Sequence, residues 1–199
     1  LSVLVTRHWQ RFQEVGHVLP DALLKDLPRV WAGSDYVAEQ FIRDADLGDW
    51  LAGCALKARL EPGRLGEEIS QAVMACDDED ALKATLRRLR HRHMVRLIWR
   101  DLTGLADYHA TVADLSLLAD TLIATALEKL YQWACERNGT PRDEQGRPVK
   151  LVVLAMGKLG ARELNLSSDI DLIFAYEDEG EIEGERRNLT HHQFFLRLG

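Results

Sequence analysis

Residues 155–174, AMGKLGARELNLSSDIDLIF, hold the pattern that decides how this chain folds. The continuously apolar, β-branched run at 151–156 leads into them and predicts a buried strand. A second strand is expected at 169–176, after a turn that contains two glycines. Asp169 and Asp171 stand two apart at the start of that strand, so both carboxylates are expected on one side of it, about 6 to 7 Å apart.

The paired aspartates predict a metal site. Two like charges held this close are unfavourable unless a cation lies between them, and Mg²⁺ is a hard cation that prefers oxygen ligands. Gly157 and Gly160 allow backbone amides to approach a phosphate, and Lys158 adds a positive charge. An Asp-x-Asp pair alone is more commonly two solvated carboxylates. Its combination with the strands and the glycine turn is more specific and suits phosphoryl or nucleotidyl transfer at a two-metal site.

The composition places the chain among globular proteins and limits the classes of partner that it is expected to bind. Hydrophobic residues make up 46% and charged residues 29% of the 199, which excludes disordered, collagen-like and disulfide-dense classes. The net charge of −7 argues against nucleic-acid binding. The apolar runs are too short to span a bilayer, so no membrane partner is expected. Cys54, Cys76 and Cys135 have no zinc-ligand spacing and no secretory signal pattern stands at the start, so a cytoplasmic location is expected.

Helices are expected throughout residues 1–138. The spacing of apolar residues predicts helices at 3–15, 46–60, 65–75 and 79–102. Ser34 is expected to cap a further helix, and the last one is expected to start at Asp114 and end at Asn138. The first 138 residues therefore form a helical region.

The remaining residues differ from the helical region in composition and pattern. Residues 139–148, GTPRDEQGRP, predict a loop or domain boundary, and 149–199 are interpreted as the first part of an α/β domain. A loop is expected at 177–187, and Thr190 is expected to cap a final helix. Phe194, Phe195 and Leu198 in that helix are expected to need a partner surface supplied by later residues. The expected fold class is α+β.

The motif order resembles a known superfamily. Gly157-Lys158 followed by Ser168-Asp169-Ile170-Asp171-Leu172 resembles the nucleotidyltransferase core of DNA polymerase beta-like enzymes. The longer string MGKLGARELNLSSDIDLIFAY is similar to one family within it, the bifunctional glutamine synthetase adenylyltransferase/adenylyl-removing enzymes. Upstream, LRRLRHRHMVRLIWRDL at 86–102 resembles the Arg-rich helix of that family, and ADTLIATALEKLY fits the segment before its first strand. The resemblance covers nearly the whole chain.

The resemblance implies a reaction. In that family the N-terminal half removes AMP from a tyrosine of glutamine synthetase by phosphorolysis and releases ADP, and the C-terminal half attaches AMP from ATP. The sequence around Asn165 and Ser-Ser-Asp-Ile-Asp, which follows a long helical region, is more similar to the N-terminal half than to the C-terminal half. Glutamine synthetase and a PII-type nitrogen signal protein are the implied partners.

The resemblance also implies site residues. Carried over by position, Asp169 and Asp171 would hold two Mg²⁺ ions, and Gly157, Lys158 and Ser168 would border the nucleotide phosphates. The superfamily often has Gly-Ser where this chain has Gly157-Lys158, although the closer family has Gly-Lys. The third metal carboxylate is expected beyond Gly199. The chain begins at Leu1 rather than Met and stops at Gly199 within an expected helix, so it is interpreted as a fragment of a longer protein.

Three alternatives stay open at this point. Glu163 and Asn165 are expected either to support the metal ligands or to cap the turn after a short helix. The arginines of 83–100 form either a solvated face with ion pairs or a surface that docks glutamine synthetase or approaches the nucleotide. The alternative function is a non-catalytic regulatory module, in which a degenerate nucleotidyltransferase fold binds nucleotide or a signalling partner. The intact Asp-x-Asp argues against that alternative.

Overall fold

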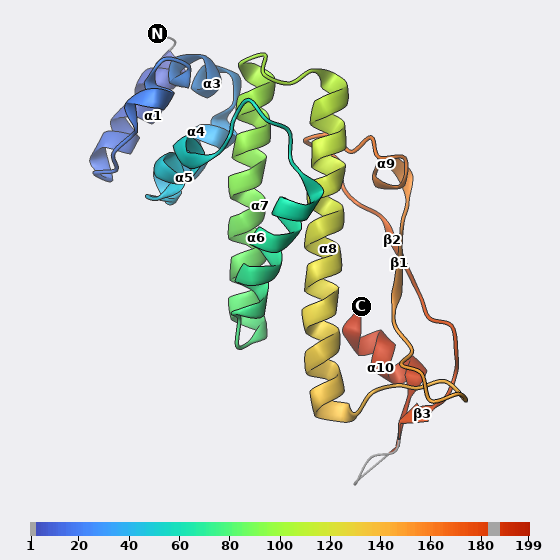
Figure 1. Cartoon of the computed structure of the whole chain (residues 1–199). Coiled ribbons are helices and arrows are strands. Elements are labelled where there is room, and N and C mark those ends of the chain that lie inside the picture. The colour runs from blue at the N-terminus through green and yellow to red at the C-terminus, as the bar shows by residue number, and fades with distance from the viewer. Residues whose placement is uncertain (1–2, 183–187) are drawn as a thin grey trace.

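The computed structural model describes residues 3–182 and 188–199, and helices dominate it (Figure 1). The helices are α1 (Val3–Glu14), α2 (Asp21–Leu24), α3 (Leu27–Gly33), α4 (Asp35–Arg43), α5 (Leu47–Gly53), α6 (Pro62–Met74), α7 (Glu79–Leu102), α8 (Tyr108–Asn138), α9 (Gly157–Gly160) and α10 (His191–Leu198). The strands are β1 (Val152–Ala155), β2 (Leu172–Ala175), β3 (Glu181–Ile182) and β4 (Leu189–Thr190). Both strand pairs, β1–β2 and β3–β4, are antiparallel. Mostly helical structure with small antiparallel strand pairs is consistent with the expected α+β class.

Polar side chains begin several helices where the sequence predicts it. The Ser34 hydroxyl accepts a hydrogen bond from the Val37 amide at 3.3 Å and caps α4. Thr190 caps α10 in a reciprocal arrangement with Gln193, whose side chain accepts from the Thr190 amide. Such caps satisfy amides in the first helical turn that have no partner within the helix. Both predicted starts are confirmed.

Other helix boundaries differ from the expectation. The helix predicted at 46–60 ends as α5 at Gly53, and Pro62 already belongs to α6. Helix α8 starts at Tyr108, where the Asp107 carboxylate accepts from the Ala110 amide at 2.7 Å. Asp114 is therefore not a helix start. It looks like a cap in the sequence, but its carboxylate is buried inside the helical region and bonded to arginine. Helices α2 and α3 were not predicted individually.

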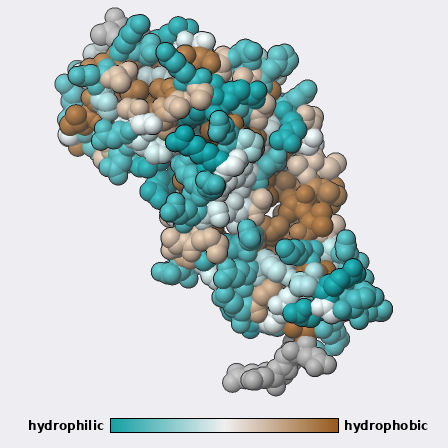
Figure 2. Space-filling model, viewed as in Figure 1, coloured by the Kyte–Doolittle hydropathy of each residue, from teal (hydrophilic) through white to brown (hydrophobic). Residues whose placement is uncertain are grey.

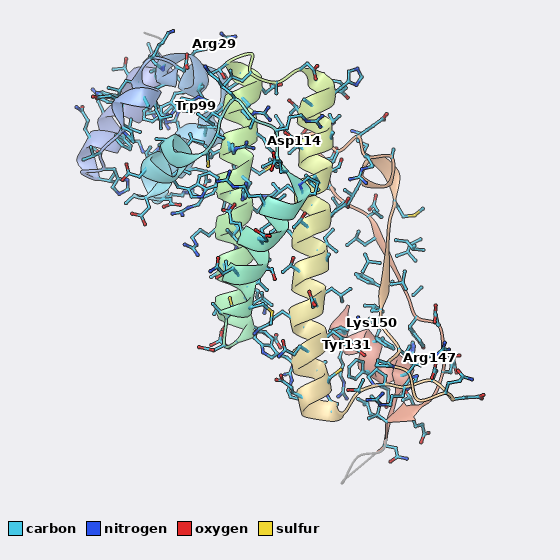
Figure 3. All side chains as sticks on the ribbon, viewed as in Figure 1. Arg29, Trp99, Asp114, Tyr131, Arg147 and Lys150 are labelled. Carbon is cyan, nitrogen blue, oxygen red and sulfur yellow. The ribbon has the colours of Figure 1, made fainter. Side chains whose placement is uncertain are left out.

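The hydrophobic core has three parts that run along α7 and α8. Helices α1, α3, α4 and α5 pack around Trp31 and the end of α7 at Trp99 (Figure 3). Helix α6 packs against both α7 and α8, and Leu159 and Leu164 from the loop after β1 join that cluster. A third cluster lies where α10 meets the end of α8. The first strands are thus fixed to the helical region through apolar contacts.

Helix α8 bears on the expectation that no segment of the chain could span a bilayer. Among the described residues, this one helix is long and apolar enough to cross a membrane by length and composition, whereas the sequence was expected to have no such segment. The same helix packs against α6, α7 and α10. Core helices of soluble proteins meet the same criterion, so the finding is only weak support for a membrane span.

The β1–β2 hairpin leaves an apolar face open. Its register pairs Leu154 with Ile173 and Val152 with Ala175. Val152, Leu154 and Ile173 are 44%, 49% and 48% exposed, and Figure 2 shows a hydrophobic patch over this hairpin. The prediction of a buried strand is wrong for these side chains. The run is apolar enough for burial, but burial requires a layer on each face, and one face of the hairpin is open to solvent.

The last residues also depart from the prediction. The loop expected at 177–187 contains strand β3, while its residues 183–187 lie outside those that the structure describes. Phe194 and Phe195 are 2% and 3% exposed, and their cluster includes Val149 and, from the end of α8, Tyr131. The expectation that these phenylalanines need later residues for cover is therefore wrong. The long α8 supplies the surface.

Candidate functional site

The loop between β1 and β2 carries the predicted site residues and is anchored on α8. Leu159 and Leu164 are 3% and 7% exposed and pack into the α6–α7–α8 core. The Leu164 amide donates a hydrogen bond to the hydroxyl of Ser116, a fully buried residue of α8, at 3.1 Å. Apolar burial and this buried hydrogen bond hold the loop to the helix.

The glycine turn packs closely against the end of β1. A Cβ on Gly160 would overlap the carbonyl oxygen of Ala155, so only glycine fits there. Gly157 adopts φ +56°, a left-handed conformation that also favours glycine. The side chain of Lys158 is exposed on α9. The turn therefore needs glycine at both positions, while phosphate contacts at Gly157 and Lys158 stay a prediction.

Asn165 organises the residues that follow it. Its side-chain oxygen accepts hydrogen bonds from the Ser167 amide at 3.2 Å and from the Ser168 hydroxyl at 2.6 Å. This is the local turn that asparagine commonly makes with the residue two positions on. Of the two roles left open for Asn165, these contacts support the turn. Glu163 is exposed on the same loop, and its backbone amide donates to the Lys158 carbonyl.

A cavity of about 670 Å³ lies between this loop and helices α7 and α8. Asn165, Ser168 and Asp169 line it from the loop, and Arg87 and Arg90 line it from α7. Its apolar wall comes from Leu86, Met94, Leu115, Leu118, Ala119, Leu122, Ile123, Ala126, Leu164, Leu166 and Ile170. The remaining predicted site residues, Gly157, Lys158, Glu163 and Asp171, do not line this cavity. A predominantly apolar cavity with a few polar groups at one end is typical of ligand pockets.

The two aspartates stand just before β2 rather than within it. Strand β2 begins at Leu172, and Asp169 and Asp171 are both exposed. The Asp171 carbonyl accepts a hydrogen bond from the Met156 amide at 2.9 Å, which fixes its backbone beside the end of β1. Placing them inside a strand was therefore wrong, because strand pairing ends at Leu172.

The donor chemistry of the aspartates fits Mg²⁺. Two exposed carboxylates offer hard oxygen ligands, and Asp169 also faces the cavity. Within residues 3–182 and 188–199, however, no group of three or more His, Cys, Asp or Glu side chains could hold a metal ion. The described residues thus supply two carboxylates, and a magnesium site at them stays a prediction.

The basic helix α7 divides into structural and accessible arginines. Arg92 bonds the Asp44 carboxylate at 2.7 and 2.9 Å, and Arg100 bonds Asp114 at 2.7 Å. Arg96 and Arg100 are 5% and 2% exposed, so they are not part of a solvated face or a docking surface. That expectation is wrong for the second half of the helix, where α7 passes through the core.

Arg87 and Arg90 are exposed and point to a feature that the sequence interpretation missed. The basic helix was predicted, but the position of these two arginines at a cavity that Asp169 also lines was not. The available signal was their spacing, because Arg87, Arg90 and His91 are three and four residues apart and so share a helix face. Burial and the nearby Arg90 lower the pKa of His91, which hydrogen-bonds the Tyr36 hydroxyl at 2.7 Å.

A family model and several known proteins that match this chain all identify the same family. The family model of glutamate-ammonia ligase adenylyltransferase matches residues 24–199. The chain is 41% identical over 205 residues to the bifunctional glutamine synthetase adenylyltransferase/adenylyl-removing enzyme of Shewanella loihica, covering all of this chain and 21% of that protein. Proteins of the same name from Pseudomonas aeruginosa and Thioalkalivibrio sulfidiphilus are 49% and 48% identical, each covering 90% of this chain and 18% of the relative. The chain spans about a fifth of these relatives, and it belongs to the glutamate-ammonia ligase adenylyltransferase family.

Proposed function

We propose that this chain takes part in removing AMP from an adenylylated tyrosine of glutamine synthetase by phosphorolysis. It would do so as part of the N-terminal, adenylyl-removing half of a bifunctional enzyme whose other half uses ATP to attach AMP. The observation that carries the proposal is the cavity lined by Ser168 and Asp169 from the loop and by Arg87 and Arg90 from α7. The names of the relatives support glutamine synthetase as the protein substrate.

The reaction makes two demands on the site. An oxygen of inorganic phosphate attacks the α-phosphorus of the tyrosyl-AMP ester, the bond from phosphorus to the tyrosine oxygen breaks, and ADP and tyrosine leave. Both reactants are anionic, so the site must gather negative charges and hold them in line. No protein nucleophile is needed, because phosphate itself attacks.

Residues on the two sides of the cavity meet these demands in different ways. Arg87 and Arg90 would attract the attacking phosphate, since guanidinium groups form strong paired hydrogen bonds with phosphate oxygens. Asp169 and Asp171 would hold Mg²⁺. When bound, such ions stabilise the attacking and leaving oxygens of an in-line displacement. Asn165 holds the Ser168 hydroxyl at 2.6 Å and so fixes the loop that presents Asp169.

Further parts of the proposal follow from the same family membership. The hairpin β1–β2 and the turn at Gly157 would be the start of a DNA polymerase beta-like nucleotidyltransferase core, with the domain boundary at 139–148. Gly157, Lys158 and Ser168 would border the nucleotide phosphates, and Glu163 would support the metal ligands. A PII-type signal protein would be a regulatory partner, and the enzyme would be cytoplasmic. Neither nucleic acid nor a membrane would be a partner.

The test uses the full-length protein that contains this chain. With adenylylated glutamine synthetase, phosphate and Mg²⁺, Asp169→Asn should reduce ADP release at least about a hundredfold, because the amide keeps the shape but loses the charge that holds Mg²⁺. Asp80→Asn, at a carboxylate 99% exposed on α7, is the control and should leave the rate unchanged. Near-normal phosphorolysis by Asp169→Asn would overturn the proposal and favour a regulatory module.

Two further experiments test where phosphate binds and whether the 199-residue chain contains a complete active site. Arg87→Gln should raise the KM for phosphate about tenfold, whereas Arg88→Gln, at an exposed neighbour that does not line the cavity, should not. The 199-residue chain assayed alone should be inactive, because two carboxylates leave one of two metal ions loosely held. Turnover by that chain at the rate of the full-length protein would show that the third carboxylate is not required.

A further inference from the structure

A second cavity, of about 100 Å³, lies where the connection between α5 and α6 passes over α7. Its charged lining consists of Arg59, Arg64 and Arg96, together with Glu61 and Glu68. It shares no lining residue with the cavity at Asp169. Three arginines against two carboxylates give this small space a net positive lining in a chain whose net charge is −7.

Arg96 is the unusual member of this cluster. Its side chain is 5% exposed, and its Nη2 donates to the carbonyl oxygens of Ala55 at 3.3 Å and Ala58 at 2.7 Å. Its Nη1 is buried and has no hydrogen-bond partner among the residues that the structure describes. Burial lowers the pKa of Arg96, as expected for a desolvated cation.

Two neighbouring arginines of α7 each bond a carboxylate, which Arg96 does not. Arg92 and Arg100 each bond a carboxylate at 2.7 Å, which compensates the cost of removing the guanidinium from water. Arg96 has only neutral carbonyl partners. A buried cation without an anion is costly, so a negative charge placed beside it is strongly favoured.

The carboxylates near this cavity make no ion pair with Arg96 in the described part of the chain. The Glu68 carboxylate lies 3.4 Å from His93 Nε2, and contact with His93 lowers the pKa of Glu68. Arg59 lies 3.4 Å from Asp114. Arg64 is exposed at the cavity and makes no hydrogen bond or ion pair within the described part of the chain. Among the described residues, Arg64 and Arg96 are therefore the two lining guanidinium groups that make no ion pair with a carboxylate, although Glu68 acts electrostatically on both.

We propose that this cavity binds a tetrahedral oxyanion, such as inorganic phosphate, between Arg64 and Arg96. A volume of about 100 Å³ accommodates such an ion but not a nucleotide, and guanidinium groups match its oxygens in geometry and charge. The bound ion would join α6, through Arg64, to α7, through Arg96, and so stabilise the helical region. This site is separate from the proposed phosphorolysis and does not depend on it.

Cys54 provides a local reporter for the test. It is a free, half-buried thiol that lines this cavity, and Cys135, also free and partly buried, packs in the third core cluster. In full-length protein with EDTA, millimolar phosphate or sulfate should slow the alkylation of Cys54 by iodoacetamide at least about threefold, through blocked access and added negative charge. Chloride at equal ionic strength should not, and Cys135 should label equally throughout. Peptide mass spectrometry separates the two sites.

Two variants assign the effect to the cavity. Arg64→Gln should weaken phosphate protection of Cys54 about tenfold, whereas Arg29→Gln, at an exposed arginine of α3 (Figure 3), should leave it unchanged. Arg96→Lys keeps the positive charge but loses the paired N–H donors of the guanidinium group, so phosphate protection of Cys54 should again weaken. A thermal melt in chloride checks that this variant folds. The inference is overturned if phosphate and sulfate leave Cys54 labelling unchanged, if acetate alone protects, or if Arg64→Gln protects as well as the unaltered protein.

Discussion

Asp114 shows how one buried carboxylate joins separate parts of the helical region (Figure 3). It is 1% exposed on α8, and it accepts hydrogen bonds from Arg100 on α7 at 2.7 Å and from Arg59 at 3.4 Å. The Leu60 amide donates to it at 3.5 Å. A charge pair this deep is stable only as a pair, because each member alone would be an uncompensated ion in the core.

Removing the charge of Asp114 should therefore destabilise the protein strongly. Asp114→Asn should lower the free energy of unfolding by about 3–5 kcal/mol, because Arg100 stays buried without a counterion. Urea unfolding followed by tryptophan fluorescence measures this. Asp120→Asn is the control, since that carboxylate is 43% exposed and 3.5 Å from Arg162, and it should cost no more than about 1 kcal/mol. Equal losses in the two variants would contradict the prediction.

At the scale of elements, the short turn α9 sets the position of the loop that carries the aspartates. The backbone of Gly160 packs directly on the Ala155 carbonyl, at the end of β1. Leu159, beside it, enters the core formed with α7 and α8. The turn thus connects the hairpin to the helices, and a shift there would move Ser168 and Asp169 relative to Arg87.

The same substitution at two glycines should have opposite effects. Gly160→Ala should destabilise the protein by about 1–3 kcal/mol, because its Cβ overlaps backbone that cannot rotate away. Gly66→Ala, inside α6 with open space around the added Cβ, should stabilise it by up to about 1 kcal/mol, because alanine favours helix. Thermal melts of both variants test the pair. A neutral Gly160→Ala would mean that α9 does not pack on β1 as described.

At the scale of the whole molecule, the helical region has a closed core, whereas the hairpin has an open apolar face. Trp31 and Trp99 are at most 1% exposed, while Leu154, Ile173 and Phe174 are each close to half exposed. Contiguous exposed apolar area of this kind commonly marks a surface that another layer covers. An open, apolar strand pair also invites association between copies.

The 199-residue chain alone should therefore self-associate through the hairpin. Light scattering should show a concentration-dependent increase in mass, and a hydrophobic dye should bind. The double variant Leu154→Thr with Ile173→Thr should reduce both, because the two side chains are cross-strand partners on that face. The matched control is Val18→Thr with Leu196→Thr, at exposed apolar side chains outside the hairpin, and it should change neither. A monomeric chain without dye binding would contradict this.

The sequence alone determined the helical character of residues 1–138, the caps at Ser34 and Thr190, the helix end at Asn138 and the two strands around the glycine turn. These features depend on local spacing and on side chains that satisfy nearby amides, so the printed residues suffice. The sequence also indicated the family, because the string from Met156 to Tyr176 is specific to it. The roles of the individual site residues remain predictions.

Tertiary structure decided what local patterns cannot express. Asp107 and Asp114 are both plausible helix caps, and only the position of Arg100 shows that Asp114 is a buried ion partner. The arginines of α7 look alike along the chain, yet Arg96 is buried, whereas Arg87 is exposed and lines the same cavity as Asp169. Burial and charge pairing depend on residues far apart in sequence, so they are fixed only when α6, α7 and α8 pack together.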